Sequence, residues 1–156
     1  MLRPVITSFV LLFLVSLSAD AQVTADRLRR ASDEPENWLT YSGSYSSIRH
    51  SLLDQISPKN VQDLKLAWVF QARSLENFTA TPLVVDGIMY VTQAPNDVVA
   101  LDAKTGRIFW VYNYTPSADA RPCCGRVNRG VAILGDTLFM ATLDAQLIAI
   151  DAVTGR

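Results

Sequence analysis

The chain has 156 residues, of which 49% are hydrophobic and 19% are charged, a balance typical of a globular protein. Its formal net charge is −1, so nothing in the charge balance favours a nucleic acid or an anionic membrane as a partner. The length is sufficient for one domain with its own hydrophobic core.

Residues 1–21 have the pattern of a secretory signal peptide. A positive start that includes Arg3 precedes an apolar run over Val5–Leu17, and Ala19-Asp20-Ala21 fits the small-x-small rule for cleavage before Gln22. The apolar run is too short for a comfortable membrane span, although an uncleaved N-terminal anchor is the alternative interpretation. Either interpretation takes the rest of the chain across a membrane, into a compartment where disulfides persist.

The segment that follows is polar and charged, and we expect residues 22–37 to form a flexible lead-in with at most a helical turn. A short helix is predicted over Ser57–Leu64, because Ser57 is a good N-cap and Pro58 is favoured at the first helical position. The alternation of apolar and polar residues over Leu64–Phe70 then predicts a strand.

Two stretches of the chain repeat without a gap at an offset of 49 residues. Leu83–Val91 matches Ala132–Met140, and Val98–Arg107 matches Leu147–Arg156. A fixed period in this range indicates a solenoid, a propeller or another repeat array.

Each repeat is predicted to be β-structure. An Asp-Gly or Gly-Asp turn joins two apolar strands, and a second strand ends in Asp-Ala-x-Thr-Gly-Arg. A further strand over Ile108–Tyr114 carries Trp110, which completes the four strands of one propeller blade. We expect structural roles for the aspartates at the turns, which are Asp86, Asp102, Asp136, Asp144 and Asp151.

The second repeat ends at Arg156 without a matching Trp strand. Such an ending would leave an apolar edge unpaired, and repeat folds usually need three or more units to bury a core. We therefore expect residues 38–156 to be about the first two blades of a β-propeller in a longer protein, with the all-β fold class that this implies.

Cys123 and Cys124 are adjacent and are the only cysteines. Neighbouring Cα atoms lie about 3.8 Å apart, closer than a relaxed disulfide prefers, and a bond between them would close almost no loop of chain. Such a bond therefore makes little sense as a staple and more sense as a rigid, flat surface in a site. Two reduced thiols are the alternative.

Several motifs in the chain together resemble the N-terminal part of the pyrroloquinoline-quinone (PQQ)-dependent alcohol dehydrogenases. The resemblance covers about residues 36–156, and its most specific part is the cysteine pair followed by Val-Asn-Arg-Gly. The motifs are, in order, Trp38–Gly43, Leu66–Phe70, Thr81–Gly87, Leu101–Gly106, Cys123-Cys124 and Val127–Gly130.

The resemblance implies an eight-bladed propeller with PQQ near its axis. It implies a vicinal disulfide between Cys123 and Cys124 against one face of the cofactor, and a contact from Arg129 to the quinone. A surface salt bridge is the alternative for Arg129, and Asn128 either holds the turn or contacts the cofactor. Arg121 and Arg126 are expected at the rim.

One position departs from the family pattern. Many members have a glutamate that reaches the cofactor where this chain has Thr79. A hydroxyl can still hydrogen-bond a PQQ oxygen, but it supplies no charge. Glu76 lies three residues earlier, an odd offset that would point it to the opposite face of a strand.

By this resemblance the chain belongs to a periplasmic oxidoreductase that oxidises alcohols or related hydroxyl compounds with PQQ and passes electrons to an acceptor such as a cytochrome c. A divalent cation, calcium by expectation, and the catalytic aspartate would be held beyond residue 156, so no metal ligand or general base is assigned. His50 lies outside any ligand pattern, and no Cys-x-x-Cys-His motif for haem occurs. A non-catalytic envelope scaffold or an inactive fragment are the alternatives.

Overall fold

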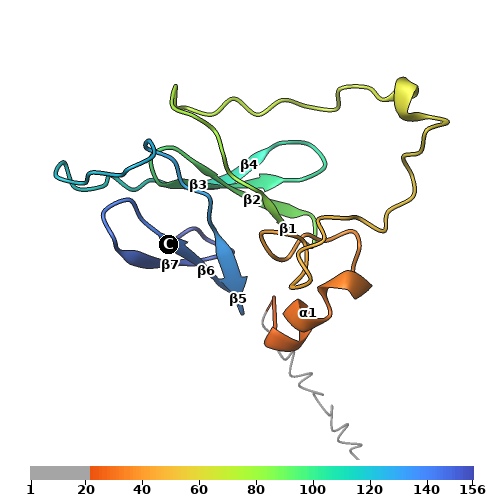
Figure 1. Ribbon diagram of the computed structural model, residues 1–156, viewed down its shortest axis with the longest axis horizontal. Helices are drawn as coiled ribbons and strands as arrows, with labels where there is room; N and C mark the ends of the chain where they lie inside the picture. The colour runs from red at the N-terminus through yellow and green to blue at the C-terminus, as the bar shows by residue number, and fades with distance from the viewer. Residues whose placement is uncertain (1–21) are drawn as a thin grey trace, which may run out of the picture.

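The computed structural model describes residues 22–156 and contains two antiparallel sheets, one of four strands and one of three (Figure 1). The predicted signal peptide lies outside the described residues. The strands are β1 (Leu83–Val85), β2 (Ile88–Gln93), β3 (Asp97–Asp102), β4 (Ile108–Tyr112), β5 (Ala132–Leu134), β6 (Thr137–Ala141) and β7 (Leu147–Asp151), and the helical turns are α1 (Ala25–Arg29), η1 (Ala31–Asp33) and η2 (Val61–Asp63).

The two sheets follow the 49-residue repeat. In both sheets the strands pair in chain order, β1-β2-β3-β4 and β5-β6-β7. Corresponding backbone bonds recur as well, since Ala103 N–H donates to Gly87 O at 2.9 Å and Ala152 N–H donates to Asp136 O at 2.8 Å. The predicted all-β repeat, with the Trp110 strand as the fourth strand of the first unit, is confirmed.

The Asp-Ala-x-Thr-Gly turns are held by their own aspartates. Asp102 Oδ1 accepts backbone hydrogen bonds from Lys104 and Thr105, and Asp151 Oδ1 accepts the equivalent bonds from Val153 and Thr154. The Thr105 N–H is the main cause of the lowered pKa of Asp102. The Thr154 hydroxyl, followed by the Thr154 N–H, is the main cause of the lowered pKa of Asp151, because hydrogen-bond donors favour the charged form.

A tryptophan from the preceding segment rests on each of these turns. Trp68 Nε1 donates to Ala103 O and Trp110 Nε1 donates to Ala152 O, both at 3.2 Å. Trp110 belongs to the first sheet and Ala152 directly follows β7 of the second, so this contact joins the two units.

The main core lies between the sheets. One face of the first sheet contributes Leu83, Val85 and Tyr90, and the second sheet contributes residues such as Leu138 and Ile150, all fully buried. The opposite face of the first sheet carries a second apolar cluster around Val91, Val99 and Leu101, against which Trp68 and Phe70 pack. The alternation of side chains along each strand produces these two faces.

The expectation of a flexible lead-in over residues 22–37 is wrong. Val23 pairs with Gly135 in a β-bridge and is fully buried, and Leu28 enters the main core. Arg27 binds both Glu34 and Asp86. The segment is charged on average, but the apolar side chains of Val23 and Leu28 pack into the main core and dock it on both sheets (Figure 1).

The segment before the first sheet also differs from expectation. Only η2 is helical in the predicted helix over residues 57–64, and the Ser57 hydroxyl donates to Asn60 rather than capping a helix. Leu64–Phe70 is not assigned as a strand, because no neighbouring backbone pairs with it within residues 22–156. It runs in the extended arm at the top right of Figure 1, where Leu64 and Leu66 are exposed.

Candidate cofactor site

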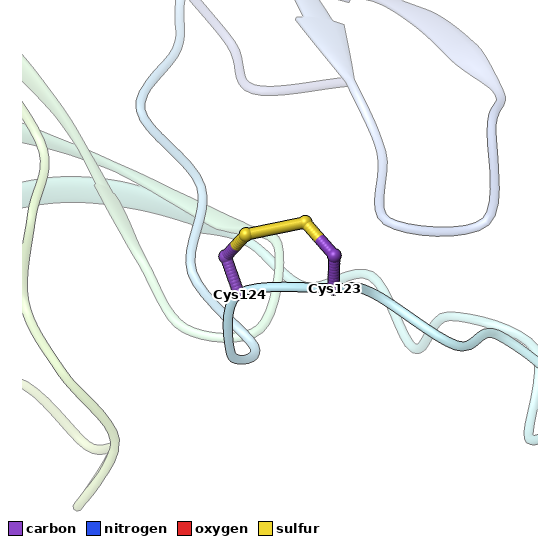
Figure 2. Close-up of a disulfide and its surroundings, with 2 residues drawn as sticks. All are labelled: Cys123 and Cys124. Carbon is purple, nitrogen blue, oxygen red and sulfur yellow. A yellow bond between two sulfur atoms is a disulfide. The ribbon is translucent and has the colours of Figure 1, made fainter.

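Cys123 and Cys124 form a disulfide, with Cα atoms 3.8 Å apart (Figure 2). The pair lies on the long loop over residues 113–131, which joins β4 of the first sheet to β5 of the second. Both residues are exposed, and the two sulfur atoms project together from one side of the backbone. The reduced-thiol alternative is therefore not what the structure shows, and the ring presents a sulfur surface to its surroundings.

Two aspartates hold the first stem of this loop, which is the part that directly follows β4. Asp97 Oδ1 accepts the Tyr114 N–H at 3.1 Å. Asp144, on the hairpin between β6 and β7, accepts the Tyr114 hydroxyl and the Ser117 N–H, each at 2.9 Å. Asp144 also accepts the Thr142 hydroxyl, the largest of the interactions that lower the pKa of its carboxyl. The aspartate expected to be structural thus fixes the loop that carries the cysteines.

Asn128 holds the second stem of the loop, which is the part that directly precedes β5. Its Nδ2 donates to Asn96 Oδ1 and to Ala141 O, both at 2.8 Å, and its Oδ1 accepts the Gly130 N–H at 2.8 Å. The side chain is buried, so of the two sequence interpretations the geometry corresponds to the one in which Asn128 holds the turn.

Arg129, the next residue, is exposed. Its side chain makes no hydrogen bond or ion pair with any residue in 22–156, so the predicted alternative of a surface salt bridge is absent from this part of the chain. Its charge reaches Tyr41, whose pKa is lowered first by Arg49, then by Thr81, and to a smaller extent by Arg129. The Arg49 guanidinium lies 4.8 Å from the centre of the Tyr41 ring.

The two other arginines of the loop flank the cysteine pair in the sequence. Arg121 donates to the carbonyls of Ala118 and Ala120, and Arg126 is exposed. Together they line a hollow of about 280 Å³ with Pro122 and Leu143. The rim position expected for these two arginines from the sequence stays a prediction.

Thr79 lies on another segment, the stretch that leads into β1. It is exposed and forms no hydrogen bond within residues 22–156, so the structure does not join it to the cysteine loop. Glu76 is exposed on the same stretch. The assignment of Thr79 to a cofactor contact stays a prediction.

Sequence reasoning missed Thr92 and Asn96, which lie beneath the loop. Thr92 Oγ1 donates to Asn128 O at 2.8 Å, and both Thr92 and Asn96 are almost fully buried. No sequence signal distinguishes them, because polar residues near a hairpin ordinarily indicate a turn rather than a buried contact.

Neither a metal centre nor a membrane-spanning helix is found in residues 22–156. No three side chains of His, Cys, Asp or Glu gather there as metal ligands would, and none of the helices in this part of the chain has the length and apolarity to cross a membrane.

With this fold and this loop in place, comparison with known proteins defines the class. Residues 38–156 match the family "PQQ: Glucose/ethanol/alcohol dehydrogenase, beta-propeller domain". The chain belongs to this family, and its two sheets are therefore blades of a β-propeller.

Particular relatives are similar over most of the chain. The dehydrogenase subunit of the quinone alcohol dehydrogenase from Acetobacter aceti is 44% identical over 145 residues, which cover 91% of this chain and 20% of that protein. The solved quinohemoprotein alcohol dehydrogenase ADHIIG from Pseudomonas putida HK5 has a TM-score of 0.81 and 42% identity, over 88% of this chain and 20% of that one. A europium-containing methanol dehydrogenase has a TM-score of 0.78 and 43% identity, over 84% of this chain and 24% of that one. The chain thus spans about a fifth of the length of the curated relatives it matches.

Proposed function

We propose that this chain supplies part of the PQQ site of a periplasmic quinoprotein that oxidises alcohols or related hydroxyl compounds. One observation carries the proposal: an exposed vicinal disulfide shares a loop with Arg129, which is exposed and has no partner within residues 22–156. A guanidinium without a partner in these residues, on the same loop as a flat sulfur surface, is a poor stabiliser of the fold and a good receptor for a planar anion.

The residues fit the cofactor. PQQ is flat and carries three carboxylates, so the Cys123–Cys124 ring can cover one face while Arg129 donates to an oxygen at the edge. Thr79 would add a hydroxyl donor. When bound, PQQ supplies the capacity to accept two electrons from the alcohol carbon. The part of the protein in this chain binds and orients the cofactor and shields one of its faces.

Other parts of the proposal concern the whole protein. The cation, calcium in our proposal, and the general base would be held by residues other than those of this chain. A relative from Methylacidiphilum fumariolicum is named a lanthanide-dependent methanol dehydrogenase, and metal analysis of the isolated protein tests the calcium assignment. The electron acceptor would be a cytochrome c, to which the quinohemoprotein names of relatives lend support. Periplasmic location is supported by the signal-like sequence at residues 1–21 and by the disulfide.

The test uses the protein isolated from the cells that make it, freed of cofactor and loaded with metal. This protein is titrated with PQQ, and binding is monitored by fluorescence and by dye reduction with an alcohol. We expect saturable binding and PQQ-dependent reduction, and an intact mass well above the 17.2 kDa of this chain. Absence of PQQ binding would overturn the proposal and favour a non-catalytic propeller of the cell envelope. A native mass of about 17 kDa or less would favour an inactive fragment.

A further inference from the structure

The disulfide ring owes its position to the two stems of its loop. Within the described part of the chain, no hydrogen bond involves any residue from 122 to 127, so the tip that carries Cys123 and Cys124 has no polar anchor of its own. Fixing a receptor for a rigid planar ligand requires that its parts be held by their surroundings. Within residues 22–156, the hydrogen bonds that hold the tip of the loop are therefore those that its two stems make with the sheets.

The second stem has the more informative anchor, because Arg129 lies on it. Both N–H donors of Asn128 are used, by Asn96 Oδ1 and Ala141 O, and its oxygen accepts the Gly130 N–H. The amide has no donor left for a cofactor. Asn128 points into the space between the sheets, whereas its neighbour Arg129 is exposed. Fixing the Asn128 amide thus fixes the direction in which Arg129 leaves the backbone.

Two buried polar side chains contact Asn128 from the β2–β3 hairpin, Thr92 on β2 and Asn96 in the turn. Thr92 Oγ1 donates to Asn128 O, and Asn96, which is fully buried, accepts from Asn128 Nδ2. The other polar atom of Asn96, Nδ2, is buried and has no hydrogen-bond partner within residues 22–156. Buried polar groups are costly unless they are paired, so an apolar pair here would be the more stable choice. A hydrogen bond is directional and therefore gives the Asn128 side chain one defined orientation, which an apolar contact would not do.

We propose that Thr92, Asn96 and Asn128 act as positioning residues that set the Cys123–Cys124 ring and Arg129 in a fixed relation to each other. The proposal rests on the proposed function, because the relation matters only if one planar anion touches both. It also changes the role of Asn128, which acts on the cofactor from behind the loop without touching it.

The test uses isosteric changes in the protein as isolated from its cells. Thr92→Val removes the hydroxyl and keeps the shape, Thr92→Ser restores the hydroxyl, and Asn96→Leu removes the acceptor for Asn128. Thr154→Val is the matched control, because its Oγ1 donates to Asp151 at 2.8 Å in a turn outside the loop. For each variant the Kd for PQQ, the rate at which a water-soluble phosphine reduces the ring, and Tm are measured.

We expect Thr92→Val and Asn96→Leu to raise the Kd for PQQ about tenfold and to change the rate of ring reduction severalfold, because access of the attacking group to the sulfurs depends on how the loop is held. Thr92→Ser should restore both values. Thr154→Val should lower Tm and leave both unchanged, the pattern expected of a merely structural hydroxyl.

The possible failures are distinct. If the wild-type protein does not bind PQQ, the proposed function falls, while the rate of ring reduction in the variants still decides whether the three residues hold the ring. If the wild-type protein binds PQQ and the Thr92→Val protein matches it in Kd and in reduction rate, the positioning role is overturned. The comparison of Thr92→Val with Thr92→Ser decides the positioning role even if Asn96→Leu fails to fold.

Discussion

Trp110 lies flat against Gly155, so that a Cβ atom added to this glycine would come within 2.6 Å of the indole ring. Trp110 belongs to β4 of the first sheet, and Gly155 follows β7 of the second. The same relationship, at the same 2.6 Å, occurs between Trp68 and Gly106. The glycine of the Thr-Gly turn is therefore required for a tertiary reason as well as for its positive φ of 72°.

The first prediction compares two glycines that both have a positive φ. Gly155→Ala should destabilise the protein by about 3 kcal/mol or more, because a left-handed alanine costs about 1–2 kcal/mol and the indole must also move. Gly87→Ala should cost only the backbone part, because Gly87 has a φ of +82° but no atom within 4 Å of the added Cβ. The free energies of unfolding in urea measure both, and equal losses would contradict the contact.

The second prediction concerns Arg27, which binds Glu34 and Asp86 and lowers the pKa of both carboxyls through hydrogen bonds. Carboxyls with a lowered pKa stabilise the fold above their ordinary range near pH 4, and this stability is lost as the pH falls through the folded value. Arg27→Gln should therefore destabilise the protein by about 1 kcal/mol at pH 7 and by less at pH 3.

Arg29 provides the control for this ion pair. Its partner Asp26 is half-exposed and Arg29 is mostly exposed, so Arg29→Gln should leave the free energy of unfolding nearly unchanged at both pH values. A loss for Arg27→Gln that is the same at pH 3 as at pH 7 would show that packing of the Arg27 stem, and not its charge, holds the N-terminal segment.

The third prediction separates stability from binding at the disulfide. Replacing Cys123 and Cys124 together by serine should change the free energy of unfolding by less than about 1 kcal/mol, because the bond closes almost no loop. The same change should abolish or strongly weaken PQQ binding in a fluorescence titration. A large loss of stability with unchanged PQQ affinity would identify the ring as a structural element.

The fourth prediction concerns the guanidinium of Arg129. Arg129→Gln should weaken PQQ binding by roughly 10- to 100-fold, and Arg129→Lys should recover part of the loss, because lysine keeps the charge without the fork of donors. The exposed Arg126 lies on the same loop and serves as the control, with an expected effect of Arg126→Gln below about threefold. Equal effects of the two glutamine variants would indicate a diffuse attraction by positive charge.

Much of this architecture could be predicted from the sequence, because its signals are local or periodic. The strands and turns of the 49-residue repeat depend on apolar alternation and on turn residues such as Asp102 and Asp151, whose carboxylates bond to their own loops. The Leu64–Phe70 strand was wrongly predicted, because alternation specifies a half-buried extended segment but not a neighbour to pair with. The lead-in was wrongly predicted because average polarity does not reveal where single residues such as Val23 dock.

The sequence by itself determined the β repeat, the adjacent cysteines and the Arg129 that follows them, because these depend on residue type and spacing along the chain. Only the tertiary structure decided that Asn128 faces inward with its amide fully bonded, and that Thr92 and Asn96 lie beneath it. The contacts of Thr92 and Asn96 with Asn128 join residues more than 30 positions apart, whose approach is set by the packing of one sheet on the other. A hydrogen bond of this kind has no local signature, since any polar residue near a hairpin could equally well have pointed to solvent.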